Sequence, residues 1–194
     1  MIRYRFVFSR DKRAKDIGFL RQVEQFRNMF RNAFSDNELQ KNKISFGPAI
    51  PCGYESLSEY VDIYLSRRIQ DEEIKFIINK NICEGYSLLR FKTIPLYFPS
   101  VESCVDIAEY EILTDDESPL IFAKEDDSIN CSEKCFKVVS VSDVKKNGER
   151  IIIYMKKLEK PEAFLTRLDK SINVKGIIRK NLYWLDSKKT LRII

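Results

Sequence analysis

The chain contains no histidine among its 194 residues, so it lacks the side chain that most enzymes use as a general base near neutral pH. Ser-His-Asp and Cys-His arrangements are excluded with it, and so is the commonest metal ligand. The sequence also has no G-x-G-x-x-G or G-x-x-x-x-G-K-[ST] run that would cradle a phosphate. We therefore predict no catalytic residues and no cofactor.

Cysteine and acidic side chains offer little more chemistry. Cys131 and Cys135 have the first spacing of a C-x3-C-x2-C iron-sulfur motif, but Val138 stands where the third cysteine belongs. We predict no metal site and interpret the five cysteines as reduced thiols. Glu59 and Asp62 are an odd number of residues apart in a predicted strand, which puts them on opposite faces. We interpret both as solvated charges.

Basic residues give the better candidate site. Residues 1–46 carry 11 basic and 5 acidic side chains, and residues 156–194 carry 11 and 4. Such clusters suit contact with a phosphate backbone, although they equally suit solvation of exposed helix faces. The residues that we predict to contact RNA are Arg10, Lys12, Arg13, Lys15, Arg21, Arg27, Arg31, Lys41, Lys43, Arg179 and Lys180. Tyr183 and Trp184 alternate faces, so at least one ring is expected to be exposed for stacking on a base, unless both fill the core.

The elements that must position these residues follow a regular order. Residues 3–8 alternate as a strand, and aromatic and apolar residues recur at helical spacing over 16–34. Strands are predicted at 43–50 and 58–65, a helix at 69–80 and a strand at 86–93. This order, β-α-β-β-α-β, is that of a ferredoxin-like half at residues 1–94.

A connector at 95–103 contains Pro95 and Pro99, which do not fit regular pairing, so we predict an extended link there. The second half, 104–194, repeats the order of the first. Its predicted elements are a strand at 104–113, a weak or shortened helix at 115–129, a hairpin of 136–144 and 150–157 around Asn147-Gly148, a helix from Pro161 and a strand at 176–185. The predicted fold class is α+β, with two tandem ferredoxin-like (βαββαβ) halves packed together.

The first eight residues alternate charged and apolar side chains. They lack the apolar core of a signal peptide and the length of a membrane span. We expect a cytoplasmic protein with no membrane partner.

Residues 44–65, I-S-F-G-P-A-I-P-C-G-Y-E-S-L-S-E-Y-V-D-I-Y-L, combine a strand with a structural turn at Phe46, Gly47, Pro48 and Gly53. Together with R-Y-R-F at 3–6 and A-E-Y-E at 108–111, this segment resembles the radical-SAM-linked family of uncharacterised bacterial proteins, found alone or fused to cobalamin-type radical SAM enzymes. The resemblance covers nearly the whole chain and implies a radical SAM enzyme as a partner. Residues 18–24 and 37–42 depart from the family's pattern, so no histidine role carries over.

Three hypotheses follow. The leading one is a non-catalytic RNA-binding or substrate-presenting accessory protein that works with a radical SAM RNA-modifying enzyme and holds phosphates with residues 10–15 and the first helix. The second is a histidine-free enzyme acting on RNA or a small metabolite near the turn at Phe46. The third is a protein-binding module whose acidic middle, residues 47–155 with 20 acidic and 12 basic side chains, docks a basic partner.

Overall fold

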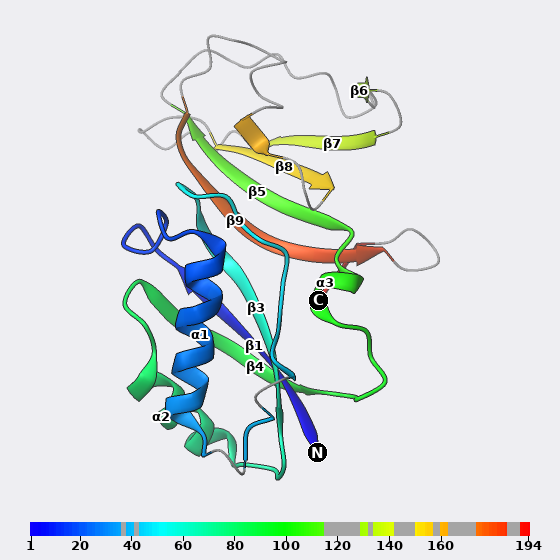
Figure 1. Cartoon of the computed structure of the whole chain (residues 1–194). Coiled ribbons are helices and arrows are strands. Elements are labelled where there is room, and N and C mark those ends of the chain that lie inside the picture. Colours follow the sequence, from blue (N-terminus) through cyan, green and yellow to red (C-terminus); the bar gives the residue numbers. More distant parts are fainter. Residues whose placement is uncertain are drawn as a thin grey trace. The chain divides into compact units, whose positions relative to one another are not determined.

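The structure is a computed structural model that describes residues 1–35, 38–40, 43–114, 129–131, 134–141, 150–156, 160–162, 174–185 and 191–194 (Figure 1). It divides into two compact units, Met1–Cys104 and Val105–Ile194. Both units contain antiparallel strands, and helices accompany those of unit 1, so the predicted α+β class is confirmed.

Unit 1 is an antiparallel sheet with two helices on one face (Figure 1). Strand β1 lies between β4 and β3, and the short β2 pairs with the other side of β3. Its elements in chain order are β1 (Ile2–Arg10), α1 (Phe19–Ala33), β2 (Ser45–Phe46), β3 (Glu55–Leu65), α2 (Asp71–Asn81), β4 (Tyr86–Ile94) and α3 (Val101–Cys104).

Aromatic packing between β1 and α1 holds the helices on the sheet. Alternation along β1 points Phe6 and Phe8 toward the helices, while the 3.6-residue period of α1 brings Phe26 and Phe30 to meet them. The ring centroids of Phe8 and Phe26 lie 4.8 Å apart, and those of Phe6 and Phe30 lie 5.4 Å apart. Such tilted ring pairs stabilise a core beyond the area that they bury.

Several predicted boundaries in unit 1 shift for local reasons. Helix α1 begins at Phe19 rather than at residue 16, because residues 12–16 form turns and Gly18 is the N-cap. Strand β2 has only two residues, since Pro48 follows closely and cannot donate to a ladder. The connector, predicted to be extended, contains α3. Its Cys104 amide bonds the Ser100 carbonyl, so the next strand starts later than predicted.

The strands of unit 2 are also antiparallel: β5 lies between β9 and β8, and β7 pairs with β8. Strand β6 pairs with β7, and β10 with β9. The strands are β5 (Ile107–Thr114), β6 (Ile129–Cys131), β7 (Lys134–Val141), β8 (Arg150–Lys156), β9 (Val174–Leu185) and β10 (Leu191–Ile193). The pairing of the predicted hairpin is confirmed, while its turn at Asn147-Gly148 lies outside the described residues.

The helices that would complete the second half fall almost wholly outside the described residues. Ile129, predicted to end a helix, opens β6, and only Pro161 and Glu162 of the later helix are described. The tandem ferredoxin-like arrangement therefore stays a prediction. Within the described part of the chain, no helix combines the length and apolar character needed to cross a membrane.

Candidate anion-binding site

The loop between β1 and α1, residues 11–18, carries three of the eleven predicted RNA contacts, Lys12, Arg13 and Lys15, and it directly follows a fourth, Arg10, the last residue of β1. The Arg10 side chain is buried, with 1% of its surface exposed. Its Nε donates to the Ala14 carbonyl at 3.0 Å, and its Nη2 donates to the carbonyls of Lys15 and Ile17. A guanidinium with its donors directed at loop carbonyls braces the loop from inside and is not presented to a phosphate.

Two further contacts fix this loop. The Gly53 amide donates to the Lys15 carbonyl at 2.8 Å, and the Asp11 amide donates to the Gly85 carbonyl at 2.9 Å. Gly85 has a φ of +81°, and a Cβ built there would lie 2.7 Å from that of Ala14. Only glycine fits that position without strain. The backbone of the loop is therefore held from the β3 side and the β4 side.

The fixed loop turns its charged side chains outward. Lys12 and Arg13 are exposed and Lys15 is half-buried. Arg13 bonds Asp11 at 2.6 Å, which lowers the pKa of that carboxyl through the hydrogen bond from Arg13. The Arg13 and Asp11 pair is exposed, so water and salt screen it and a phosphate can compete for the guanidinium. Lys12 makes no ion pair within the described residues.

Helix α1 continues the basic surface. Arg21, Arg27 and Arg31 are exposed on it, and the Arg27 guanidinium lies 5.8 Å from the centre of the Phe46 ring. The first turn of α1 contains no acidic residue, and no side chain caps its N-terminus. The positive end of the helix dipole therefore adds to the charge of the loop that precedes it.

The remaining predicted contacts with RNA belong to both units. Lys43 is exposed just before β2, and Lys41 lies outside the described residues. In unit 2, Arg179 is buried with 1% exposed, and the Lys180 ammonium pairs with Glu111 at 2.9 Å. Both residues lie on β9, in unit 2.

The interpretation of Asp62 and Glu59 as solvated charges is wrong. Asp62 is fully buried, and its two oxygens accept hydrogen bonds from Arg3 and Arg5. Glu59 is also buried and accepts a hydrogen bond from Gln22, whose Oε1 faces Arg10 at 3.4 Å. The odd spacing correctly predicted opposite faces, but both faces are covered at this point of β3. Buried charges of this kind persist because they are paired.

The predicted turn is built around a close backbone approach. The Gly47 amide donates to the Tyr60 carbonyl at 2.9 Å, and a Cβ on Gly47 would lie 3.4 Å from side-chain atoms of Tyr60 and Val101. Pro48 is buried, while Gly53 is exposed with a φ of +89°. These residues shape the approach to β3 and supply no reactive group.

Sulfur and carboxylate groups do not gather into a metal site within the described residues. Cys52 is exposed, and Cys83 and Cys104 are half-buried free thiols whose pKa values are raised by burial. The side chains of Cys131 and Cys135 lie outside the described residues.

Unit 2 contains a polar cluster that the sequence reasoning missed. Glu109 on β5 accepts hydrogen bonds from Tyr183 at 2.5 Å and Asn181 at 2.7 Å, both on β9. The period-two spacing of these two β9 residues could have indicated one face. Because Tyr183 is engaged in this cluster, Trp184 is the exposed aromatic of the pair, with 37% of its surface accessible.

A search of curated proteins gives no match to the chain. A family model described as an uncharacterised protein conserved in bacteria (DUF2344) matches residues 3–175. The match takes in the whole of unit 1 from β1 onward, with its braced loop and basic helix, and unit 2 as far as the first residues of β9. The chain therefore belongs to this conserved bacterial family.

Proposed function

We propose that the protein is a non-catalytic RNA-binding accessory protein whose primary contact is the basic surface formed by Lys12 and Arg13 of the loop and Arg21, Arg27 and Arg31 of α1. The observation that carries the proposal is the internal brace. Arg10 and the amides of Asp11 and Gly53 hold the loop in one conformation, with Lys12 and Arg13 turned outward.

Preorganisation matters because a flexible loop would lose conformational entropy on binding, which weakens affinity. A braced loop has already lost that freedom on folding. Its lysine and arginine side chains can neutralise phosphates and release bound counterions. The acid-free first turn of α1 favours the same negative charge.

The partner and the wider fold belong to the proposal as well. The resemblance to radical-SAM-linked proteins implies that the bound RNA is presented to a radical SAM enzyme that modifies it. The tandem ferredoxin-like arrangement would supply two β-rich units for this task, and the exposed ring of Trp184 would offer one stacking platform. We propose a cytoplasmic location because RNA modification of this kind takes place there.

The test is retention of total cellular RNA by the purified protein over a salt series, followed by sequencing of the retained RNA. The variant Lys12→Gln/Arg13→Gln/Arg21→Gln removes three cations and leaves Arg10 in place. The slope of log K against log salt should fall by about 2, since each contact with a single strand contributes about 0.7.

The matched control is Arg68→Gln/Lys75→Gln/Lys80→Gln, which removes three exposed cations on and beside α2. Equal slopes for the two variants would show that only net charge matters and would remove this surface from consideration. If the wild-type protein retains no RNA even at low salt, the RNA-binding function itself is wrong and a protein partner becomes the leading hypothesis.

A further inference from the structure

The face of the unit 1 sheet opposite to the helices carries a second group of cations. Arg5 on β1 is level with Asp62 on β3 and with Lys92 on β4. One row further along, Val7 is level with Arg90 on β4 and with Tyr60 on β3. None of these six residues belongs to the core cluster under α1 and α2, as expected from strand alternation.

The one carboxylate in this group, that of Asp62, is already paired with arginine side chains. Both Asp62 oxygens accept from Arg5, at 2.8 and 3.0 Å, and Oδ2 also accepts from Arg3. Two guanidinium groups thus share one carboxylate, and the pair of β4 cations, Arg90 and Lys92, adds two further positive charges beside them. With these four cations against Asp62, the group has a net charge of +3.

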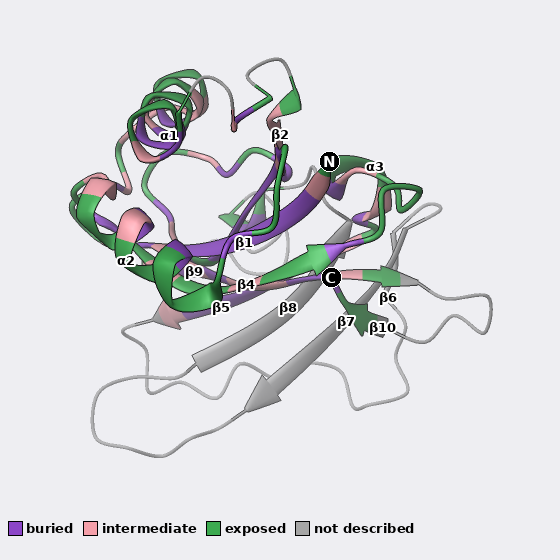
Figure 2. Cartoon of the chain, turned by 90° about the horizontal axis from the view of Figure 1, so that it is seen from below, coloured by how far each residue is buried: buried purple, intermediate pink, exposed green. Residues whose placement is uncertain are grey.

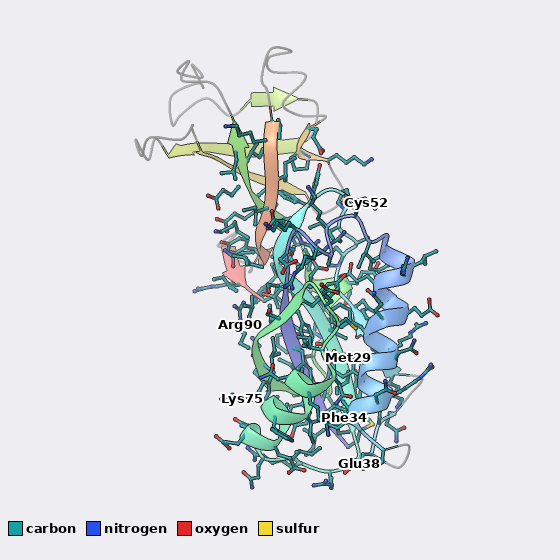
Figure 3. All side chains as sticks on the ribbon, turned by 90° about the vertical axis from the view of Figure 1, so that its left-hand side faces the viewer. Met29, Phe34, Glu38, Cys52, Lys75 and Arg90 are labelled. Carbon is teal, nitrogen blue, oxygen red and sulfur yellow. The ribbon has the colours of Figure 1, made fainter. Side chains whose placement is uncertain are left out.

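The β4 cations are placed where a ligand can reach them. Figure 2 shows β4 largely exposed next to the buried β1, and both cations are exposed. Figure 3 shows Arg90 on the side of the strands away from α1. Its Nη2 donates to the Tyr60 hydroxyl at 3.2 Å, which holds the guanidinium over the sheet face.

The surroundings of Lys92 also favour an anion. Its pKa is lowered, first by burial and then by the charges of Arg5 and Arg90, against a smaller opposing effect of Asp62. An ammonium that is partly desolvated and repelled by two guanidinium groups gains more from a bound anion than an isolated surface lysine does.

We propose that Arg90 and Lys92 bind a backbone phosphate of an RNA strand along β4, the exposed edge strand of unit 1. Two residues apart on one strand, they are about 6.8 Å apart along it, so they can contact one phosphate or two successive ones. The arginine supplies a planar fork and the lysine a point charge. The identity of the ligand as RNA rests on the proposed function, whereas the existence of an anion site rests on this geometry alone.

The test uses the full chain and the double variant Arg90→Gln/Lys92→Gln. Its control is Lys75→Gln/Lys80→Gln on α2, a helix that packs on the core cluster through Ile74 and Ile78, and it removes the same charge from exposed positions. Binding of a short single-stranded RNA of mixed sequence is followed by fluorescence anisotropy over a salt series. The slope of log K against log salt should fall by about 1.4 in the β4 variant, at 0.7 for each of two contacts. The control should stay at the wild-type slope.

A second arm uses inorganic pyrophosphate, followed by line broadening in phosphorus NMR. One outcome separates the two proposals. If the wild-type protein and the control variant broaden the pyrophosphate signal, the β4 variant does not, and the wild type binds no RNA, then the anion site is supported and the RNA-binding function is wrong. The site is wrong if the β4 variant matches the control in both arms. Binding of an acidic peptide that depends on Arg90 and Lys92, with no phosphate binding, would likewise overturn the assignment to phosphate.

The charge-preserving variant Arg90→Lys/Lys92→Arg distinguishes an effect of lost charge from an effect of misfolding. It should keep the salt slope of the wild type and lose less affinity than the glutamine variant. If it loses as much as the glutamine variant, local structure rather than charge is responsible and the proposal fails.

Discussion

At the scale of single residues, the carboxylate of Asp62 is the counter-charge of two buried arginines. It is fully buried and accepts hydrogen bonds from two arginines that are themselves buried. The Arg3 guanidinium also donates to the carbonyls of Phe98 and Pro99, which ties the connector to β1. The residues that bear the charge of this face thus also hold the chain between β4 and α3 in place.

Asp62→Asn should reduce the free energy of unfolding by about 3–5 kcal/mol, because it leaves two buried guanidinium groups without their counter-charge. Urea unfolding followed by circular dichroism measures the loss. The exposed Asp16→Asn serves as the control and should change stability by no more than about 0.5 kcal/mol. A loss below about 1 kcal/mol in Asp62→Asn would mean that water or another group compensates the arginines.

At the scale of elements, the loop between β1 and α1 depends on contacts from three directions. Arg10 braces it from within, Gly53 contacts it from the segment before β3, and Gly85 contacts it from the segment before β4. The position of Lys12 and Arg13 is therefore set by residues outside the loop, of which Arg10 and Gly85 are buried.

Arg10→Gln should loosen this loop without removing any exposed charge. The carbonyls of Ala14, Lys15 and Ile17 lose their donor, at a cost of about 1–3 kcal/mol for each buried group left unsatisfied. Hydrogen exchange of the peptide spanning residues 11–18 should quicken, and RNA affinity should fall with it. Unchanged exchange would show that the amide contacts of Asp11 and Gly53 suffice. Lost affinity with unchanged exchange would instead restore Arg10 as a direct contact.

At the scale of the whole molecule, the chain divides into two compact units, and the large aromatic core lies in the first. The core cluster runs from Tyr4 to Tyr86 and draws all of its members from unit 1. We expect a chain ending at Cys104 to keep its secondary structure and to unfold cooperatively with heat. Circular dichroism tests this, with the full chain as the reference. A broad transition without a cooperative midpoint would show that unit 1 needs the rest of the chain to fold.

Much of the fold of unit 1 was predictable because its signals are local. The alternation over β1 and β3 and the helical spacing of Phe26 and Phe30 predict these elements from a few neighbouring residues. The ends of the helices and strands were harder to predict, because they depend on specific contacts. One example is the one-turn helix α3, which begins after Ser100. Composition indicated the exposed basic residues of α1 as candidates, whereas the sequence reasoning did not single out the β4 cations Arg90 and Lys92, although their period-two spacing was visible.

The sequence by itself determined the α+β class, the order of elements in unit 1, the absence of histidine chemistry and the concentration of basic residues near the start of the chain. Only the tertiary structure decided which charges are buried. Arg10 and Lys12 are neighbours of the same charge, yet one is buried and the other exposed. The partners of Asp62 lie 57 and 59 residues away. Burial and electrostatic environment depend on what packs over a side chain, and in a folded sheet those neighbours come from strands far apart in sequence.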